Sequence, residues 1–250
     1  MCDFKKYIFT ALVLCGLLYL QAGADDVVSP PWRGVEGTTY QEWRFDSNNN
    51  PALPEVINNP YGNANAVIVV DFFGSGWLDQ LPGLGNQTGY WDIGGQDGKI
   101  TVNIDNLPAM PRKEIWIQVT YFQDITAPPI VNVSGAQYIS GQKILLYHVS
   151  TGGDWFVDQS IWRINPSPSS EQIIFTSNPS WGAIIDQIIV DTYCRACIVD
   201  FDDLSMFTEQ WLLEGADLDA DFDGNNKVDF SDFAFLASLW MQPCPSGWPW

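Results

Sequence analysis

Between about residues 30 and 193, hydrophobic and polar positions alternate along many short runs. In the clearest run, 114–122, every second residue is apolar: Ile115, Ile117, Val119 and Tyr121. A period of two is that of a β-strand with one buried face, so this run is expected to form a strand. Residues 183–192 show the same period, with Ile184, Ile188 and Val190 on one face and Ile185 and Ile189 on the other.

Further strand-like runs follow at short intervals, at 40–45, 66–73, 99–105, 143–149, 154–164 and 172–177. Segments rich in glycine, proline and asparagine separate them, and such segments form turns. No stretch of this region keeps the 3.6-residue period of a helix. The pattern predicts a mainly β fold, an antiparallel β-sandwich or jelly roll.

The pattern changes after Tyr193, where a short sequence repeats at a spacing of 29 residues. Each copy begins with Val-Asp-Phe, at 199–201 and at 228–230, and ends in an apolar stretch with a tryptophan. Within each copy, apolar residues recur at i, i+3 and i+7: Leu204, Phe207 and Trp211, then Phe233, Leu236 and Trp240. This spacing predicts one amphipathic helix per copy, and hence a small α-helical module.

The residues before the second predicted helix have the spacing of an EF-hand calcium loop. Positions 1, 3, 5, 7, 9 and 12 are held by Asp221, Asp223, Asn225, Lys227 through its carbonyl, Asp229 and Asp232. Position 6 requires a residue that tolerates positive φ, and Asn226 does. A loop that started at Asp219 or Asp217 would have no carboxylate at position 12, so the Asp221 start is the predicted register.

The first copy lacks this loop. Its corresponding positions 1, 3 and 5 hold Thr192, Cys194 and Ala196, and only Asp200 and Asp203 keep carboxylates at ligand positions. The sequence therefore predicts one calcium site and one vestigial half.

The first residues have the pattern of a secretory signal peptide. Lys5 and Lys6 precede an apolar run at 7–20 that is shorter than a membrane span, and small residues at 22–24 offer a cleavage site. We divide the chain into a signal peptide at 1–24, a β-sandwich domain at 25–193, and a calcium-binding module with a C-terminal tail at 194–250. The protein is expected to be secreted or associated with a cell surface, with no membrane insertion after cleavage.

The formal net charge of −19 argues against binding to nucleic acid or to anionic lipid. Three cysteines remain after cleavage, Cys194, Cys197 and Cys244, and export permits a disulfide between two of them. A zinc site is not expected, because the only histidine, His148, lies far from these cysteines in sequence.

The paired halves, each with an aspartate at loop position 12 before a helix, resemble type I dockerin modules over residues 194–244. The resemblance implies that the six ligand residues of the second half bind Ca²⁺, and that the module attaches the protein to a cohesin-like domain. The first half, which keeps carboxylates at only two of the ligand positions, departs from the family pattern. Within such a module, a Cys194–Cys244 disulfide would join the two ends, with Cys197–Cys244 as the competing pair.

Tryptophans are frequent in the sandwich region, and aromatic rings can stack on the apolar faces of sugars. Trp116 and Trp162 lie inside strand patterns and are expected in the core. The candidates for carbohydrate stacking lie beside turn residues: Trp77, Trp91, Trp155 and Trp181.

The sequence assigns no catalytic residue, because a single strand histidine is more often structural than catalytic. We expect an exported, non-catalytic protein with a carbohydrate-associated sandwich and a calcium-binding attachment module. Two alternatives stay open. One is a small polysaccharide-active enzyme, either a lyase that uses Tyr147, His148 and Lys143 or a glycosidase with paired carboxylates. The other is a structural envelope protein.

Overall fold

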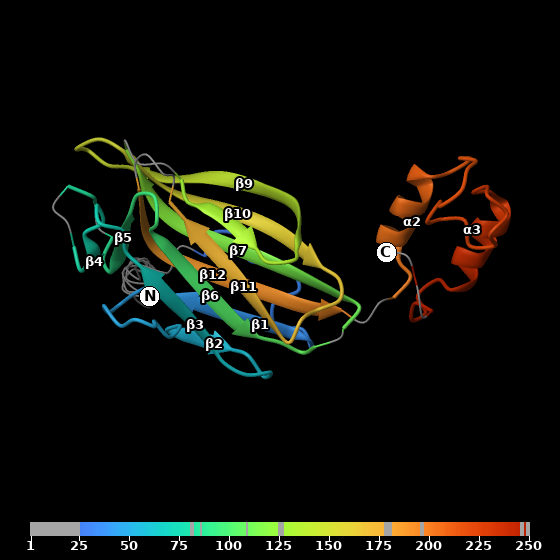
Figure 1. The fold of residues 1–250 in the computed structure, drawn as a ribbon, viewed down its shortest axis with the longest axis horizontal. Helices are drawn as coiled ribbons and strands as arrows, with labels where there is room; N and C mark the ends of the chain where they lie inside the picture. The colour runs from blue at the N-terminus through green and yellow to red at the C-terminus, as the bar shows by residue number, and fades with distance from the viewer. Residues whose placement is uncertain are drawn as a thin grey trace, which may run out of the picture.

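The structure, a computed structural model, describes residues 26–250 except 81–82, 86, 109, 125–127, 178–181, 196–197, 246–247 and 249–250. The predicted signal peptide at 1–24 lies outside the described residues. The described chain forms two β-sheets followed by two short helices (Figure 1). Neither of these helices has the length and hydropathy needed to cross a membrane.

Eight strands form the larger sheet, sheet A. They are β1 (Thr38–Trp43), β2 (Val56–Asn58), β4 (Gly76–Leu78), β5 (Tyr90–Gly94), β7 (Arg112–Gln123), β9 (Gln137–His148), β10 (Asp154–Ile164) and β12 (Ala183–Arg195). The main order is β2-β1-β12-β7-β10-β9, and β5 pairs with both β12 and β4.

Four strands form the smaller sheet, sheet B. In their order across the sheet they are β3 (Ala64–Val69), β6 (Lys99–Asp105), β11 (Ser170–Thr176) and β8 (Ile130–Val133). The strand pairings of both sheets are antiparallel. The predicted mainly β fold, an antiparallel sandwich followed by a small helical module, is therefore confirmed.

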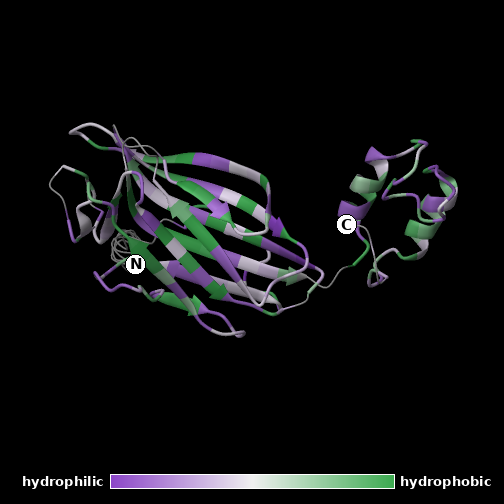
Figure 2. Ribbon diagram, in the orientation of Figure 1, coloured by the Kyte–Doolittle hydropathy of each residue, from purple (hydrophilic) through white to green (hydrophobic). Residues whose placement is uncertain are grey.

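The main hydrophobic core lies between the two sheets. Figure 2 shows hydrophobic and hydrophilic residues alternating along the strands. Sheet A contributes the predicted face of β7, on which all four residues are fully buried: Ile115, Ile117, Val119 and Tyr121. Sheet B contributes Ile100, Val102, Ile104, Ile173 and Phe175, which are equally buried. The period of two in the sequence thus directs one side of each strand into a shared core.

Strand β12 departs from simple alternation at a β-bulge. Its register with β7 shifts between Ile185 and Gln187. Because of this shift, Ile185 and Ile188 both join the main core, whereas Ile184 packs into a second cluster around Trp155. The prediction that Ile184 and Ile188 share a face is therefore wrong, because alternation does not continue across a bulge.

A buried ion pair lies within the sandwich. The Lys113 ammonium is 2.8 Å from the Glu171 carboxylate, and neither side chain has exposed surface. Lys113 also donates a hydrogen bond to Asn106. Burial raises the pKa of Glu171 to about 7, although the neighbouring ammonium opposes this shift. Each charge is therefore stabilised mainly by its partner.

Removal of one member of this pair should be more destabilising than removal of both. Lys113→Met leaves the Glu171 charge buried without its partner, so we expect the free energy of unfolding to fall by about 3–5 kcal/mol. In the double variant Lys113→Met/Glu171→Leu, much of this loss should be recovered. Urea denaturation of the two variants measures the difference, and a double variant less stable than Lys113→Met would contradict the prediction.

The C-terminal module contains the two predicted helices, α2 (Phe201–Glu209) and α3 (Phe230–Ser238). Its core joins buried apolar residues from both copies of the repeat and from the segment between them: Val199, Phe207, Ala220, Val228 and Leu236. The module therefore has a hydrophobic cluster distinct from the sandwich core.

Cys194 belongs to the sandwich rather than to the module. It lies near the end of β12, opposite Lys113 on β7, and it is buried with a free thiol. The predicted Cys194–Cys244 disulfide is therefore wrong. The competing partner of Cys244, Cys197, lies outside the described residues.

Candidate functional site

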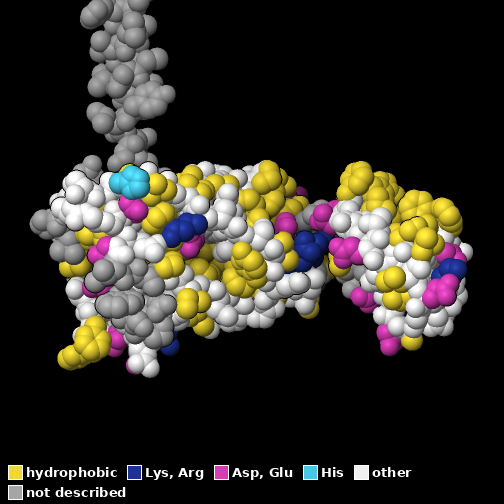
Figure 3. Space-filling model, turned by 90° about the horizontal axis from the view of Figure 1, so that it is seen from above, with side chains coloured by type: hydrophobic (Ala, Val, Ile, Leu, Met, Phe, Trp, Pro, Cys, Tyr) yellow, Lys and Arg dark blue, Asp and Glu magenta, His cyan; other side chains and the backbone are white. Residues whose placement is uncertain are grey.

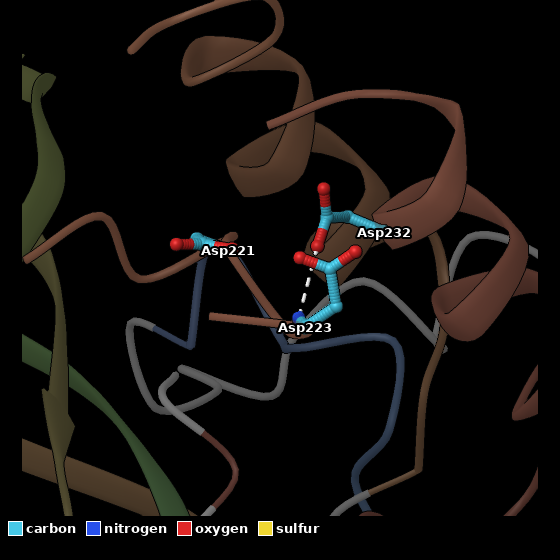
Figure 4. Close-up of side chains that lie close together, drawn as sticks. All are labelled: Asp221, Asp223 and Asp232. Carbon is cyan, nitrogen blue, oxygen red and sulfur yellow. Dashed lines mark hydrogen bonds between the residues drawn. The ribbon is translucent and has the colours of Figure 1, made fainter. Parts of the chain in front are cut away.

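Three carboxylates of the predicted calcium loop converge at the loop between α2 and α3. Oxygen atoms of Asp221, Asp223 and Asp232 all lie within 4.8 Å of one another. Figure 4 shows these side chains, with Asp221 and Asp223 on the loop and Asp232 on the first turn of α3. Asp232 is fully buried, Asp221 is half-buried and Asp223 is exposed.

The backbone of the loop turns sharply between these carboxylates. Asn226 has φ of 66°, the left-handed conformation predicted for position 6. The backbone N–H of Asn226 donates to Asp221 Oδ2 at 2.7 Å. The backbone N–H of Asn225 donates to Asp221 Oδ1 at 3.0 Å and to Asp223 Oδ1 at 3.1 Å. Amide and carboxylate residues at the predicted spacing therefore fix the shape of the loop.

Asp232 joins the loop to the helix that follows it. Its Oδ1 accepts the backbone N–H groups of Phe222 at 2.8 Å and Asp223 at 3.2 Å. Its Oδ2 accepts the backbone N–H of Asp229 at 2.9 Å, and the Asp229 side chain in turn accepts from the N–H of Ser231. This reciprocal pair is a capping box, so the residue that closes the loop also starts α3.

The other predicted ligands have different surroundings. The Asp229 carboxylate caps α3 and is not part of the carboxylate cluster. The Lys227 ammonium points to Glu214, 3.1 Å from its carboxylate. The three clustered aspartates offer only oxygen donors, which suits a hard divalent cation such as Ca²⁺. A cation would also offset the repulsion between carboxylates held this close together.

The two copies of the repeat are related by a nearly symmetric arrangement. The N–H of Val199 donates to the Gln242 carbonyl, and the equivalent N–H of Val228 donates to the Leu213 carbonyl, each at 3.0 Å. Leu212 and Met241, 29 residues apart, both have positive φ, of 63° and 58°. Each half thus pairs the start of its own helix with the segment that follows the other helix.

The symmetry extends to exposed aromatic side chains. Phe201 packs edge-on against Trp240 at 5.0 Å, and Phe230 packs edge-on against Trp211 at 5.1 Å. The two phenylalanines are 76% and 75% exposed, respectively. A groove of about 270 Å³ lies beside Phe230 and Trp211 and is otherwise lined by residues of α2 and α3. The helices therefore present an apolar face to solvent, and hydrophobic side chains gather over the module in Figure 3.

The first half of the module holds its buried aspartate in another way. The corresponding loop positions Thr192 and Cys194 are residues of β12, so no loop forms there. Asp203, 1% exposed, accepts a hydrogen bond from the indole N–H of Trp248 at 2.8 Å. Trp248 also stacks on Phe222, with ring centroids 5.0 Å apart. A tail residue thus provides a donor where the second half uses its loop backbone.

Loss of this indole donor should destabilise the module. Trp248→Phe keeps a ring for the stack on Phe222 but removes the N–H, so we expect the free energy of unfolding to fall by about 1–3 kcal/mol. Denaturation of Trp248→Phe, Asp203→Asn and the double variant measures the coupling between the two groups. If the free energy lost in the double variant equals the sum of the losses in the two single variants, the hydrogen bond contributes nothing to stability.

Two of the four predicted stacking tryptophans are buried. Trp91 lies in the main core and Trp155 in the second cluster, with exposures of 6% and 0%. Both are wrong as stacking candidates, because a buried ring cannot receive a sugar. Trp77 is half-buried against the main core, and its indole donates to the Phe45 carbonyl. Trp181 lies outside the described residues.

The residues named for a lyase are spread along β9. His148 is 76% exposed and lies 2.5 Å from the Asp154 carboxylate, whereas the Lys143 ammonium lies over the Phe156 ring.

Trp162, expected in the core, is half-buried and packs only partly against it. Sequence periodicity finds the buried side of a strand, but it does not show where the opposite sheet ends.

No protein-family model and no curated protein matches this sequence. Two solved structures are weakly similar. One is the tripod (BppUct-A-L) from the baseplate of bacteriophage Tuc2009, with 10% identity and a TM-score of 0.27, covering 78% of this chain and 94% of that one. The other is CBM35 from Cellvibrio japonicus Abf62, with 11% identity and a TM-score of 0.25, covering 50% of this chain and 91% of that one.

Proposed function

We propose that this protein is exported, and that a carbohydrate-associated β-sandwich is attached to a cohesin-like partner through a calcium-binding, dockerin-like module. The observation that carries the proposal is the convergence of Asp221, Asp223 and Asp232 in a loop with the predicted turn at Asn226. The near-symmetric pairing of the two repeat halves also supports the proposed kind of module.

Calcium is the proposed cation because the loop offers hard oxygen donors. Asp232 would be the closing ligand, and its carboxylate is already held by backbone N–H groups. The Asn225 side chain, the Lys227 carbonyl and Asp229 would complete the shell in the predicted register. An aspartate at position 12 has a shorter reach than the usual glutamate, so the closing residue must lie close to the loop.

Titration calorimetry with CaCl₂ should detect one site per chain. Asp221→Ala removes a ligand and also an acceptor for two loop N–H groups, so we expect at least a tenfold loss of affinity. Asp219→Asn is the matched control, because Asp219 is exposed and outside the carboxylate cluster. No heat of binding for the native chain, or equal affinities for native protein and Asp221→Ala, would refute the calcium site.

Attachment is proposed on the apolar face of α2 and α3. Phe201 and Phe230 occupy equivalent positions of the repeat and are strongly exposed, and each packs edge-on against the tryptophan of the other copy. A partner that covers this face would remove both rings from water. The resemblance to dockerins implies that this partner is a cohesin-like domain.

Loss of the two phenylalanines should weaken this attachment. Phe201→Ala and Phe230→Ala should each weaken binding in surface plasmon resonance against a panel of cohesin domains, and the double variant should lose most of it. Phe72→Ala, a change at an exposed phenylalanine of the sandwich, serves as the control. If the double variant binds as tightly as native protein, the proposed face is wrong.

We also propose that Cys244 forms its disulfide with Cys197. The supporting observation is that Cys194, the other candidate partner, is buried with a free thiol. Such a bond would restrain a module with only a small hydrophobic cluster.

A further inference from the structure

Sheet A has more strands than sheet B, and part of its inner face is only half-buried. On β7 the inner residues Ile117 and Val119 are fully buried. On the neighbouring strand β10 the inner residues Phe156 and Trp162 are half-buried against the same core. Strand β9, at the edge of the sheet, is exposed over most of its length. Burial falls from strand to strand, so the cover provided by sheet B ends above β10.

Six side chains form this partly exposed surface, which we call the shelf. They are Tyr138 and Lys143 from β9 and Phe156, Asp158, Ser160 and Trp162 from β10. The four β10 residues share a face because alternate residues of a strand do. Lys143 lies opposite Asp158 and Tyr138 lies opposite Trp162, and cross-strand partners point to the same side.

An aromatic pair lies at each end of the shelf. Phe156 stacks on Tyr121, with ring centroids 6.0 Å apart and an interplanar angle of 28°. Trp162 packs edge-on against Tyr138, with centroids 5.3 Å apart. Phe156 and Trp162 are six positions apart on one strand, which corresponds to about 20 Å. The shelf is therefore long and narrow, with a ring at either end.

Hydrogen-bonding groups lie between and beside these rings. The Lys143 ammonium is 3.8 Å from the centroid of the Phe156 ring and donates to Gln123 Oε1 at 2.5 Å. Asp158 accepts a hydrogen bond from the Tyr121 hydroxyl at 3.1 Å. Ser160 accepts one from the Trp162 indole at 2.9 Å. One cation and one carboxylate balance each other, so the shelf carries donors and acceptors without a large net charge.

The end of the shelf near Phe156 opens into a hollow. It has a volume of about 510 Å³, and Lys143 and Phe156 line it together with Gln123, Asp124, Asp154 and the turn at 151–153. This volume lies within the range of small-ligand sites. Figure 3, which looks onto the β9 side of the sandwich, shows single basic and acidic side chains among hydrophobic ones.

We propose that the shelf binds a segment of an uncharged polysaccharide that lies along β10. Sugar rings would contact the aromatic groups at both ends through their apolar faces, and sugar hydroxyls would bond to Lys143, Asp158 and Ser160. The length between the rings requires an oligosaccharide rather than one sugar. The inference rests on the proposed carbohydrate association of the sandwich and gives that association a position and a ligand class.

Two observations favour an uncharged glycan as the occupant. The chain has a net charge of −19, which would repel an anionic polymer, whereas an uncharged one is not repelled. The rings lie on the face of the sheet, beside groups that suit hydroxyls. A protein strand added to the open edge of β9 would instead bond mainly to the backbone, and its binding would depend little on Phe156 or Trp162.

Affinity electrophoresis of the whole chain tests the proposal with soluble xylan, hydroxyethyl cellulose and galactomannan, and with polygalacturonate as the anionic probe. Native protein should be retarded by at least one uncharged polymer. Phe156→Ala and Trp162→Ala should each weaken this retardation at least tenfold. Phe72→Ala is the matched control, because Phe72 is 91% exposed on another part of the sandwich, and it should behave as native protein. Circular dichroism confirms that each variant is folded.

The outcomes separate the position of the site from the proposed function. Retardation of native protein that survives both Phe156→Ala and Trp162→Ala would overturn the shelf and leave the carbohydrate association standing. Retardation by polygalacturonate alone would overturn the ligand class. If no polysaccharide retards the native chain, the carbohydrate association itself fails, and the shelf proposal fails with it.

Discussion

A carboxylate that is buried away from water must accept hydrogen bonds from N–H groups or pair with a cation. The architecture of this acid-rich chain depends on that requirement. In the sandwich, the fully buried Asp191 on β12 receives two hydrogen bonds of 2.6 Å from Arg33, which ties the N-terminal segment to sheet A. Burial still raises the pKa of Asp191 to about 6. Glu171 on sheet B is likewise paired with Lys113 on sheet A, and this ion pair joins the two sheets.

The same requirement explains why the two halves of the module differ. Asp203 and Asp232 each start a helix by a capping box, and each has one carboxylate oxygen left over. In the second half, two backbone N–H groups of the loop donate hydrogen bonds to that oxygen. The carboxylates of Asp221 and Asp223 lie close by in the same loop. In the first half the chain is still part of a sheet, so Trp248 from the tail provides the donor. The first half thus keeps its helix start without a loop of its own.

Periodicity was sufficient to predict β7, β10 and both helices, because each has a regular pattern of apolar positions. Of β9 it predicted only the second half, because most of that edge strand is exposed. It missed β2, β4, β5 and β8, which are too short to show a period. The spacing of acids identified Asp221, Asp223 and Asp232, since a loop of fixed length brings fixed positions together. It did not show that the Asp229 carboxylate also caps α3. Trp91 and Trp155 were wrong as stacking candidates because burial depends on which strand lies above each ring.

The high negative charge and the exposed apolar surfaces of this protein are physically connected. The shelf and the helix face both leave aromatic rings in water, and such surfaces tend to associate with one another. A net charge of −19 opposes contact between two copies of the chain, because every approach brings like charges together. It does not oppose contact with an uncharged polymer. On the shelf, the net charge would therefore favour binding to an uncharged glycan over self-association.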